Sequence, residues 1–252
     1  MSHVSVRDLW KEYPNQVVLE RVNLEIPSGE FCALVGPSGC GKTTFLRMLL
    51  GEERPTRGGI FLDDRPLVAE PGPDRGVVFQ RYSVFPHLTV LENVILGREF
   101  EGSRFLGRLF GARRRAAKEE ARGVLEAVGL GDHLGKYPAE LSGGMQQRLA
   151  IAQALILKPK ILLLDEPCGA LDAGTKAQMY ELLLRLWSEE KMTVFMVTHD
   201  LDSQTSICDR IAVLVDKKIR VGTLEQLLRD PHPWIHDYFH GPRGRAARHA
   251  ES

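Results

Sequence analysis

Apolar residues in this chain gather into short unbroken runs, and the segments between the runs are rich in helix-forming residues. A run without polar interruption is typical of a strand that is buried on both faces of its sheet. The runs cover residues 31–35, 161–164, 193–197 and 211–215, and helical segments are predicted at 43–50, 176–190 and 202–208. Buried strands that alternate with helices predict an α/β fold, in which helices cover both faces of a parallel sheet.

Two stretches depart from this alternation. Residues 4–35 are β-rich, because apolar and polar positions alternate along 22–26 and a turn sequence follows at 27–30. Residues 88–157, after a short predicted strand at 77–79, have a helical pattern almost throughout. This helical stretch is the candidate for a subdomain inserted between two strands of the sheet.

Two polar segments are expected at the surface. Residues 102–115 hold four glycine or serine residues and five arginines, which predicts a surface excursion. Beyond Asp230 the chain is rich in proline, histidine, glycine and arginine. This composition predicts a loosely held C-terminal tail over residues 231–252.

The charge of the chain limits its partners. Lys plus Arg and Asp plus Glu both number 33, so no overall field draws the protein toward nucleic acid, and we expect no nucleic-acid partner. The start of the chain has no signal-peptide pattern, and no apolar run approaches the roughly 18 residues of a membrane-spanning helix. At a membrane, another chain is therefore expected to supply the span.

The cysteines lack metal-site or disulfide spacing and are expected to be incidental thiols: Cys32, Cys40, Cys168 and Cys208.

A glycine-rich segment lies between the first buried strand and a helix, and it fits the P-loop pattern G-x-x-x-x-G-K-[ST]. Glycines let backbone N–H groups turn inward around phosphate oxygens, and the helix N-terminus adds partial positive charge. Lys42 supplies a point charge for the β- and γ-phosphates, and the Thr43 hydroxyl is a ligand for Mg²⁺. The candidate nucleotide-binding residues here are Gly36, Pro37, Ser38, Gly39, Cys40, Gly41, Lys42, Thr43 and Thr44.

An acidic pair, Asp165 and Glu166, ends the buried run 161–164. A carboxylate at the carboxyl end of such a strand lies near the Mg²⁺ ion of a P-loop fold. Asp165 is placed to bind the metal through water, and Glu166 to polarise the attacking water as a general base. The alternative is a solvated acidic pair at a strand end.

A second glycine-rich helix start lies at residues 141–148, which read Leu-Ser-Gly-Gly-Met-Gln-Gln-Arg. This string resembles the LSGGQ signature of ABC ATPases with a methionine inserted. Ser142 and the two glycines after it form a second anion-binding helix end, although the chain has one full nucleotide site. Two copies that meet head to tail explain this, with each signature closing the P-loop of the other copy. The nucleotide contacts expected from the signature are Ser142, Gly143, Gly144 and Gln146.

Further matches fall in the order that ABC ATPases show. Tyr13 resembles the aromatic residue that stacks on adenine; the alternative is a surface or core tyrosine. Gln80 resembles the Q-loop glutamine, which contacts Mg²⁺ and senses the membrane partner. Asp172 ends a stretch, 169–172, that resembles the D-loop at the dimer interface. His199 follows a strand and resembles the switch histidine that contacts the γ-phosphate, whereas a lone histidine is usually structural.

The resemblance covers about residues 4–228 and implies an ABC ATP-binding domain over 1–230, in which a RecA-like core carries an N-terminal antiparallel β-subdomain and a helical subdomain at 88–157. It implies ATP and Mg²⁺ as ligands and Glu166 and His199 as catalytic residues. The implied partners are transmembrane permease subunits, a second copy of the cassette and a substrate-binding protein. The implied place of action is the cytoplasmic face of the cell membrane.

Two resemblances point to different transporter types. Residues 81–94 are similar to the stretch after the Q-loop in nitrate, sulfonate and taurine importers, and they are expected to receive the permease; a core-packing role is the alternative for Tyr82 and Phe85. Cys168, where that type usually has phenylalanine, departs from the pattern. Residues 233–245 instead resemble the end of Mce-type lipid-trafficking cassettes. We predict an importer ATPase; the alternatives are an Mce-type ATPase and an ABC protein outside transport.

Overall fold

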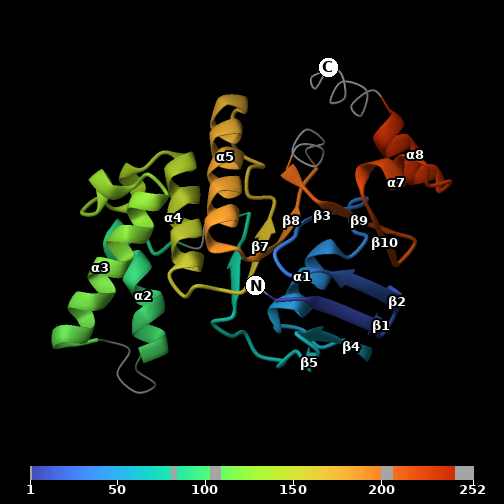
Figure 1. Ribbon diagram of the computed structural model, residues 1–252, viewed down its shortest axis with the longest axis horizontal. Helices are drawn as coiled ribbons and strands as arrows, with labels where there is room; N and C mark the ends of the chain where they lie inside the picture. Colours follow the sequence, from blue (N-terminus) through green and yellow to red (C-terminus); the bar gives the residue numbers. More distant parts are fainter. Residues whose placement is uncertain (1, 81–83, 103–108, 200–206, 242–252) are drawn as a thin grey trace.

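The computed structural model describes residues 2–80, 84–102, 109–199 and 207–241, with the side chains of 101 and 102 left out. Two sheets and a group of helices make up the described chain (Figure 1). The antiparallel sheet lies beside the P-loop helix, and the helices of the middle of the chain lie across the larger sheet on the other side (Figure 1). Within the described residues, no helix combines the length and the apolar character needed to cross a bilayer.

The larger sheet has six strands in the order β10-β9-β3-β8-β7-β6. The five strands from β9 to β6 are parallel, and β10 is antiparallel to β9. This sheet confirms the α/β prediction, and all four apolar runs lie within it. The strands are β3 (Phe31–Val35), β6 (Arg75–Val78), β7 (Ile161–Asp165), β8 (Thr193–Val197), β9 (Arg210–Val215) and β10 (Lys218–Gly222).

Both faces of this sheet are buried, which explains the unbroken apolar runs. In β3, Cys32 and Leu34 face a core shared with helix α1 (Lys42–Leu50) and the antiparallel sheet. Ala33 and Val35 face the opposite side and pack with residues from the C-terminal helices. Alternate residues of one strand therefore stabilise two separate layers.

The antiparallel sheet precedes and follows the P-loop in sequence and has the order β2-β1-β4-β5. Helix α1 is buried between it and the six-stranded sheet, because Phe45, Met48 and Leu49 pack in the core that both sheets share. This sheet confirms the predicted antiparallel β-subdomain. Its strands are β1 (Val4–Tyr13), β2 (Gln16–Ile26), β4 (Arg57–Leu62) and β5 (Arg65–Pro66).

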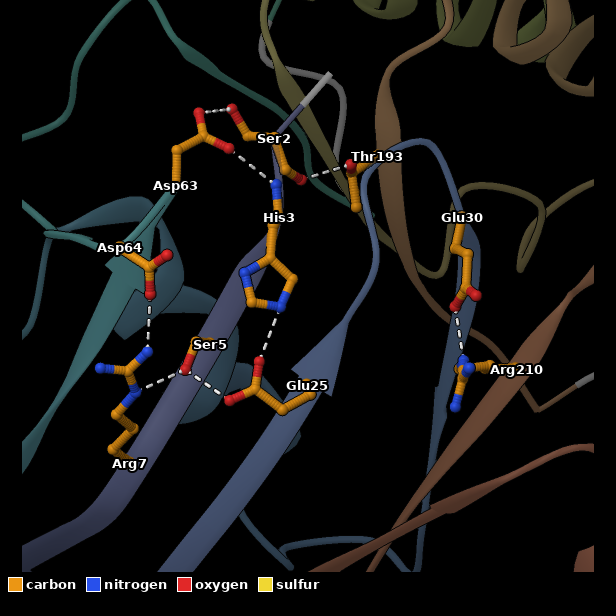
Figure 2. Close-up of polar contacts among 10 residues, drawn as sticks. All are labelled: Ser2, His3, Ser5, Arg7, Glu25, Glu30, Asp63, Asp64, Thr193 and Arg210. Carbon is orange, nitrogen blue, oxygen red and sulfur yellow. Dashed lines mark hydrogen bonds and ion pairs between the residues drawn. The ribbon is translucent and has the colours of Figure 1, made fainter.

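The residues before β1 join the two sheets (Figure 2). The Thr193 hydroxyl donates to the Ser2 carbonyl at 2.7 Å, and the Ser2 hydroxyl donates to the Asp63 carboxylate at 2.8 Å. Burial alone raises the pKa of Asp63, but the hydrogen bonds from Ser2 and the His3 N–H hold it below its ordinary value. The first residues of the chain therefore connect β8 of the large sheet to the end of β4.

The helical stretch contains three α-helices and two short 3₁₀ helices. Its elements are α2 (Val90–Gly102), α3 (Gly111–Ala127), η1 (Gly131–His133), η2 (Pro138–Glu140) and α4 (Gly143–Leu155). Arg113–Arg115 of the predicted surface excursion at 102–115 are exposed, and they lie in the first turns of α3. Residues 103–108 of that prediction lie outside the described residues.

The C-terminal part of the chain corrects one prediction. After α5 (Ala173–Glu190) and β10, helices α7 (Leu224–Leu228) and α8 (Pro233–His240) follow. Ile235 and Phe239 of α8 are buried against β3 and β9, so residues 233–240 are not a loosely held tail. The remaining tail, residues 242–252, lies outside the described residues, as does most of the helix predicted at 202–208.

Candidate active site

The P-loop leaves the carboxyl end of β3 and requires glycine at two positions. Gly36 has φ +155°, and a Cβ atom there would lie 2.3 Å from the Leu214 carbonyl oxygen. Gly41 has φ +112°, and its Cβ would lie 2.6 Å from the Val18 Cγ1 atom. Only glycine lets the loop approach β9 and β2 this closely. The loop is consequently pressed against both sheets.

Lys42, the first residue of α1, turns back into the P-loop. Its side chain is buried, and its ammonium donates to the carbonyl oxygens of Gly36 at 2.8 Å and Pro37 at 3.0 Å. No side chain caps the N-terminus of α1. The first N–H groups of this helix thus stay available for an anion, with a fixed cation beside them. Burial raises the pKa of the neighbouring Cys40 thiol, which outweighs the effect of Lys42.

The acidic pair sits where β7 ends. Burial and the neighbouring Glu166 raise the pKa of Asp165 above its ordinary value, although Lys42 and Arg47 act in the opposite direction. Glu166 has a left-handed backbone, with φ 49°, and its N–H donates to the Val197 carbonyl at 3.0 Å. The chain therefore turns at Glu166, directly after the strand that ends at Asp165.

The Glu166 carboxylate lies between two of the predicted site residues. Its Oε1 atom is 2.9 Å from His199 Nε2, and its Oε2 atom accepts from Gln80 Nε2 at 3.2 Å. Gly169 closes this group, since a Cβ there would lie 3.6 Å from both Gln80 Nε2 and Glu166 Oε2. The ends of β6, β7 and β8 therefore bring three polar side chains, far apart in sequence, to one point beside the P-loop strand.

The residues at this edge fit a hydrated divalent cation. Asp165 is a partly buried carboxylate beside a second carboxylate, so its surroundings favour an added positive charge. Gln80 uses its amide N–H on Glu166, which leaves its carbonyl oxygen for a metal. The described residues contain no group of three or more His, Cys, Asp or Glu side chains that could form a protein-only metal cage. Mg²⁺ suits such a site, because it usually keeps waters and phosphate oxygens as ligands.

The signature and D-loop residues begin two adjacent helices. The Ser142 hydroxyl caps α4 by accepting from Met145 N–H at 3.3 Å, and Asp172 caps α5 by accepting from Thr175 N–H at 3.0 Å. A Cβ on Gly144 would lie 2.7 Å from the Thr175 Cγ2 atom, so the two helix starts touch. Throughout the described chain, no hydrogen bond or ion pair joins Ser142 to the P-loop.

Gln146 was predicted to contact nucleotide, and in the structure its side chain is engaged within its own subdomain. The amide donates to the carbonyl oxygens of Pro138 at 2.9 Å and Leu141 at 3.3 Å. These bonds hold the residues that lead into the signature. Its nucleotide contact stays a prediction.

The stretch after Gln80 is anchored by a residue that sequence reasoning missed. Asn93 is buried, exchanges hydrogen bonds with the backbone of Phe85, and accepts from Gln153 of α4 at 3.1 Å. Phe85 itself is exposed and packs edge-on against His87. The exposed ring contradicts the core-packing alternative for Phe85, whereas Tyr82 lies outside the described residues. A polar residue among the apolar positions of a predicted helix is the signal that could have identified Asn93.

Tyr13 lies at the end of the β1–β2 hairpin, where it pairs with Gln16. Two residues further along β2, Val18 contacts Gly41 of the P-loop. The Tyr13 side chain is 42% exposed, which contradicts a core role, and its hydroxyl donates to Glu53 at 2.7 Å. Sequence reasoning missed Glu53, because 40 residues separate it from Tyr13.

A P-loop at the end of a buried parallel strand, with a carboxylate pair two strands away, defines a P-loop nucleoside triphosphatase. Residues 19–169 match the family described as ABC transporter. The chain belongs to this family, and it is the ATP-binding, ATP-hydrolysing subunit of an ABC transporter.

Named relatives and solved structures agree with this assignment. The chain is 42% identical to the nitrate import ATP-binding protein NrtD of Synechococcus elongatus, over 92% of this chain and 78% of the relative. It is 42% identical to the bicarbonate transport ATP-binding protein CmpD of Synechocystis sp., over 84% and 74%. A dimeric bacterial ABC transporter cassette superposes with a TM-score of 0.74 at 33% identity, covering 88% of this chain and 98% of the cassette. The post-hydrolysis dimer of that cassette, bound to ADP and phosphate, has a TM-score of 0.73 at 32% identity, with the same coverage.

Proposed function

We propose that two copies of this chain bind Mg-ATP head to tail, so that the P-loop of one copy and Ser142 of the other enclose each nucleotide. Each copy has one full phosphate site and a separate helix start at Ser142, and no hydrogen bond or ion pair between described residues joins the two. The similar solved cassette is dimeric, including in its ADP- and phosphate-bound state, which supports the same assembly here.

In this site Lys42 and the first N–H groups of α1 bind the phosphates. Asp165, Thr43 and Gln80 would hold Mg²⁺, which neutralises phosphate charge when bound. Glu166 accepts a proton from the attacking water as general base. His199 and Gln80 orient its carboxylate through their contacts at 2.9 and 3.2 Å. The contacts of His199 and Gln80 with the Glu166 carboxylate are the observation that supports its role as general base.

The variant Glu166→Gln tests both parts of the proposal. It keeps the size of the side chain but cannot take a proton, so the hydrolysis rate should fall about 10²- to 10⁴-fold while ATP still binds. With Mg-ATP the variant should elute as a dimer in size exclusion with light scattering.

The control is Glu189→Gln, which removes one exposed carboxylate near the far end of α5 and should hydrolyse ATP at the wild-type rate. Normal hydrolysis by Glu166→Gln would refute the base assignment. A variant that binds ATP and stays strictly monomeric would refute the shared site.

For the transported substrate, we propose a small inorganic anion, imported through a separate permease that receives a substrate-binding protein. The two named relatives are the ATP-binding proteins of nitrate import and of bicarbonate transport, and each is 42% identical to this chain. The exposed Phe85, held in place by Asn93, offers the permease an aromatic contact. The chain would then act at the cytoplasmic face of the membrane.

The test is reconstitution of the chain with its genomic neighbour permease in proteoliposomes. ATP hydrolysis should rise when nitrate or bicarbonate is presented with the binding protein. If ATP hydrolysis instead rises during phospholipid transfer and responds to neither anion, the chain is a lipid-trafficking ATPase and not an importer ATPase. The Phe85→Ala variant should uncouple hydrolysis from transport while its unstimulated hydrolysis remains.

A further inference from the structure

Tyr13 is held by a small charged cluster at the edge of the antiparallel sheet. Its hydroxyl donates to Glu53 Oε2 at 2.7 Å, and the Lys11 ammonium is 3.2 Å from the same oxygen. Arg47 of α1 lies 3.6 Å from the other carboxylate oxygen. Glu53 thus joins Tyr13 and Lys11, both at the end of β1, to Arg47 of the P-loop helix.

The cluster leaves one face of the tyrosine ring open. The Lys11 ammonium lies 4.9 Å from the ring centroid, and it also donates to the Arg54 carbonyl at 3.0 Å. The side chains of Lys11 and Glu53 are only 13% and 21% exposed, whereas Tyr13 is 42% exposed. A second flat ring can therefore stack only on the face that Lys11 does not cover.

The connection to α1 fixes where this ring stands relative to the phosphates. The Arg47 carbonyl accepts from the N–H groups of Glu52 at 2.9 Å and Glu53 at 3.3 Å. The residues after α1 are thereby folded back on the helix that begins at Lys42. Glu53 is consequently positioned by the same helix that binds the phosphates.

We propose that Glu53 is a positioning residue for nucleobase binding, because it fixes the Tyr13 ring at a set place relative to the P-loop. This inference rests on the expectation that Tyr13 stacks on the base of ATP. A fixed ring loses less side-chain freedom when the base stacks, so the hydrogen bond to Glu53 adds to base affinity and not to phosphate affinity. Glu53 itself touches no nucleotide atom.

The experiment compares two probes on the purified full chain by titration calorimetry with Mg²⁺: ATP, and inorganic tripolyphosphate, which lacks the base. Tyr13→Phe keeps the ring and removes only the bond to Glu53, so its Kd for ATP should rise about three- to tenfold. Its Kd for tripolyphosphate should be unchanged. Glu53→Ala should behave in the same way, while Glu53→Gln keeps an acceptor for the hydroxyl and should recover most of the ATP affinity.

Two controls separate this inference from the proposed function. Glu52→Gln removes the neighbouring exposed carboxylate, which no contact joins to Tyr13 within the described residues, and should bind both probes as wild type does. Tyr13→Ala removes the stacking ring and should weaken ATP binding more than Tyr13→Phe.

Wild-type ATP affinity in Tyr13→Phe and Glu53→Ala, with weakened binding in Tyr13→Ala, would overturn the positioning role alone. Wild-type affinity in Tyr13→Ala would overturn the stacking site itself. Equal loss for both probes would show a general structural effect and also overturn the inference.

Discussion

The chain has two helices that begin after glycine-rich sequence, α1 at the P-loop and α4 at the signature, and their N-termini are built differently. At α1 no side chain caps the helix, and the buried Lys42 adds a full positive charge. At α4 the Ser142 hydroxyl already accepts a backbone N–H, and Gln146 is bonded to the residues before it. At α1 the first backbone N–H groups remain available for an anion, whereas at α4 one such N–H group already donates to the Ser142 hydroxyl. The difference indicates a primary phosphate site and a supplementary one.

Among the variants that test this comparison, Lys42→Met should have the largest effect, and the effect should be on ATP affinity. It keeps most of the side-chain length and removes the charge, so ATP affinity should fall about 10- to 100-fold. The described residues place no carboxylate within ion-pair distance of Lys42, but its ammonium donates to the Gly36 and Pro37 carbonyls, so the loss of these two hydrogen bonds should lower the melting temperature slightly. Calorimetric titration and melting measure the two quantities. Unchanged ATP affinity would show that the α1 terminus binds phosphate without its cation.

The variant Gly41→Ala should come next, because it tests the approach of the P-loop to β2. The φ of +112° is unfavourable for alanine, and the new Cβ would meet Val18 at 2.6 Å, so stability should fall by about 1–3 kcal/mol. Gly123→Ala is the matched control, since nothing lies within 4 Å of its Cβ position in α3, and it should be neutral or stabilising. Denaturant melts compare the two; equal stability would mean that the loop relaxes freely.

The variant Ser142→Ala should have a smaller effect on the fold. Loss of an N-cap costs about 1 kcal/mol, which lowers the melting temperature of a chain this size by about 2–4 °C. Nucleotide binding to a single copy should not change, because no bond among the described residues joins Ser142 to the P-loop of its own chain. Hydrolysis at concentrations that favour the dimer should fall. A loss of affinity in the isolated copy would place the signature in the same site as Lys42.

The variant Asp165→Asn should give the smallest effect on stability, and the size of that effect depends on pH. The folded protein raises the pKa of Asp165, so the folded state binds this proton more tightly than the unfolded chain does. The contribution of this carboxyl to stability is therefore present at low pH and is lost as pH rises through the raised pKa. Without nucleotide, the variant should melt above wild type at neutral pH, and the gap should close toward about pH 4. A gap that widens in acid would contradict the assigned cause.

The core and the catalytic edge were accessible from the sequence because their signals are local. Four apolar runs defined four of the five parallel strands, and Asp165, Glu166 and His199 stand within two residues of the end of such a run, while Lys42 belongs to a contiguous P-loop motif. Two features were not accessible in this way. Ile235 and Phe239 of the short helix α8 are buried because the helix packs against strands β3 and β9, a contact that no local pattern specifies. The bond between Tyr13 and Glu53 depends on how β1 and the end of α1 are folded together.

The hydrogen bond from Glu166 N–H to the Val197 carbonyl has a mechanical consequence. It ties the carboxylate and the imidazole two residues beyond Val197 to one pair of neighbouring strands, so the sheet sets their spacing. Among the described residues, no comparable backbone hydrogen bond ties Gln80 to a neighbouring strand. Glu166 and His199 are therefore held at a fixed spacing by the sheet. Of the three side chains, Gln80 is the one whose movement would change the geometry around the Glu166 carboxylate.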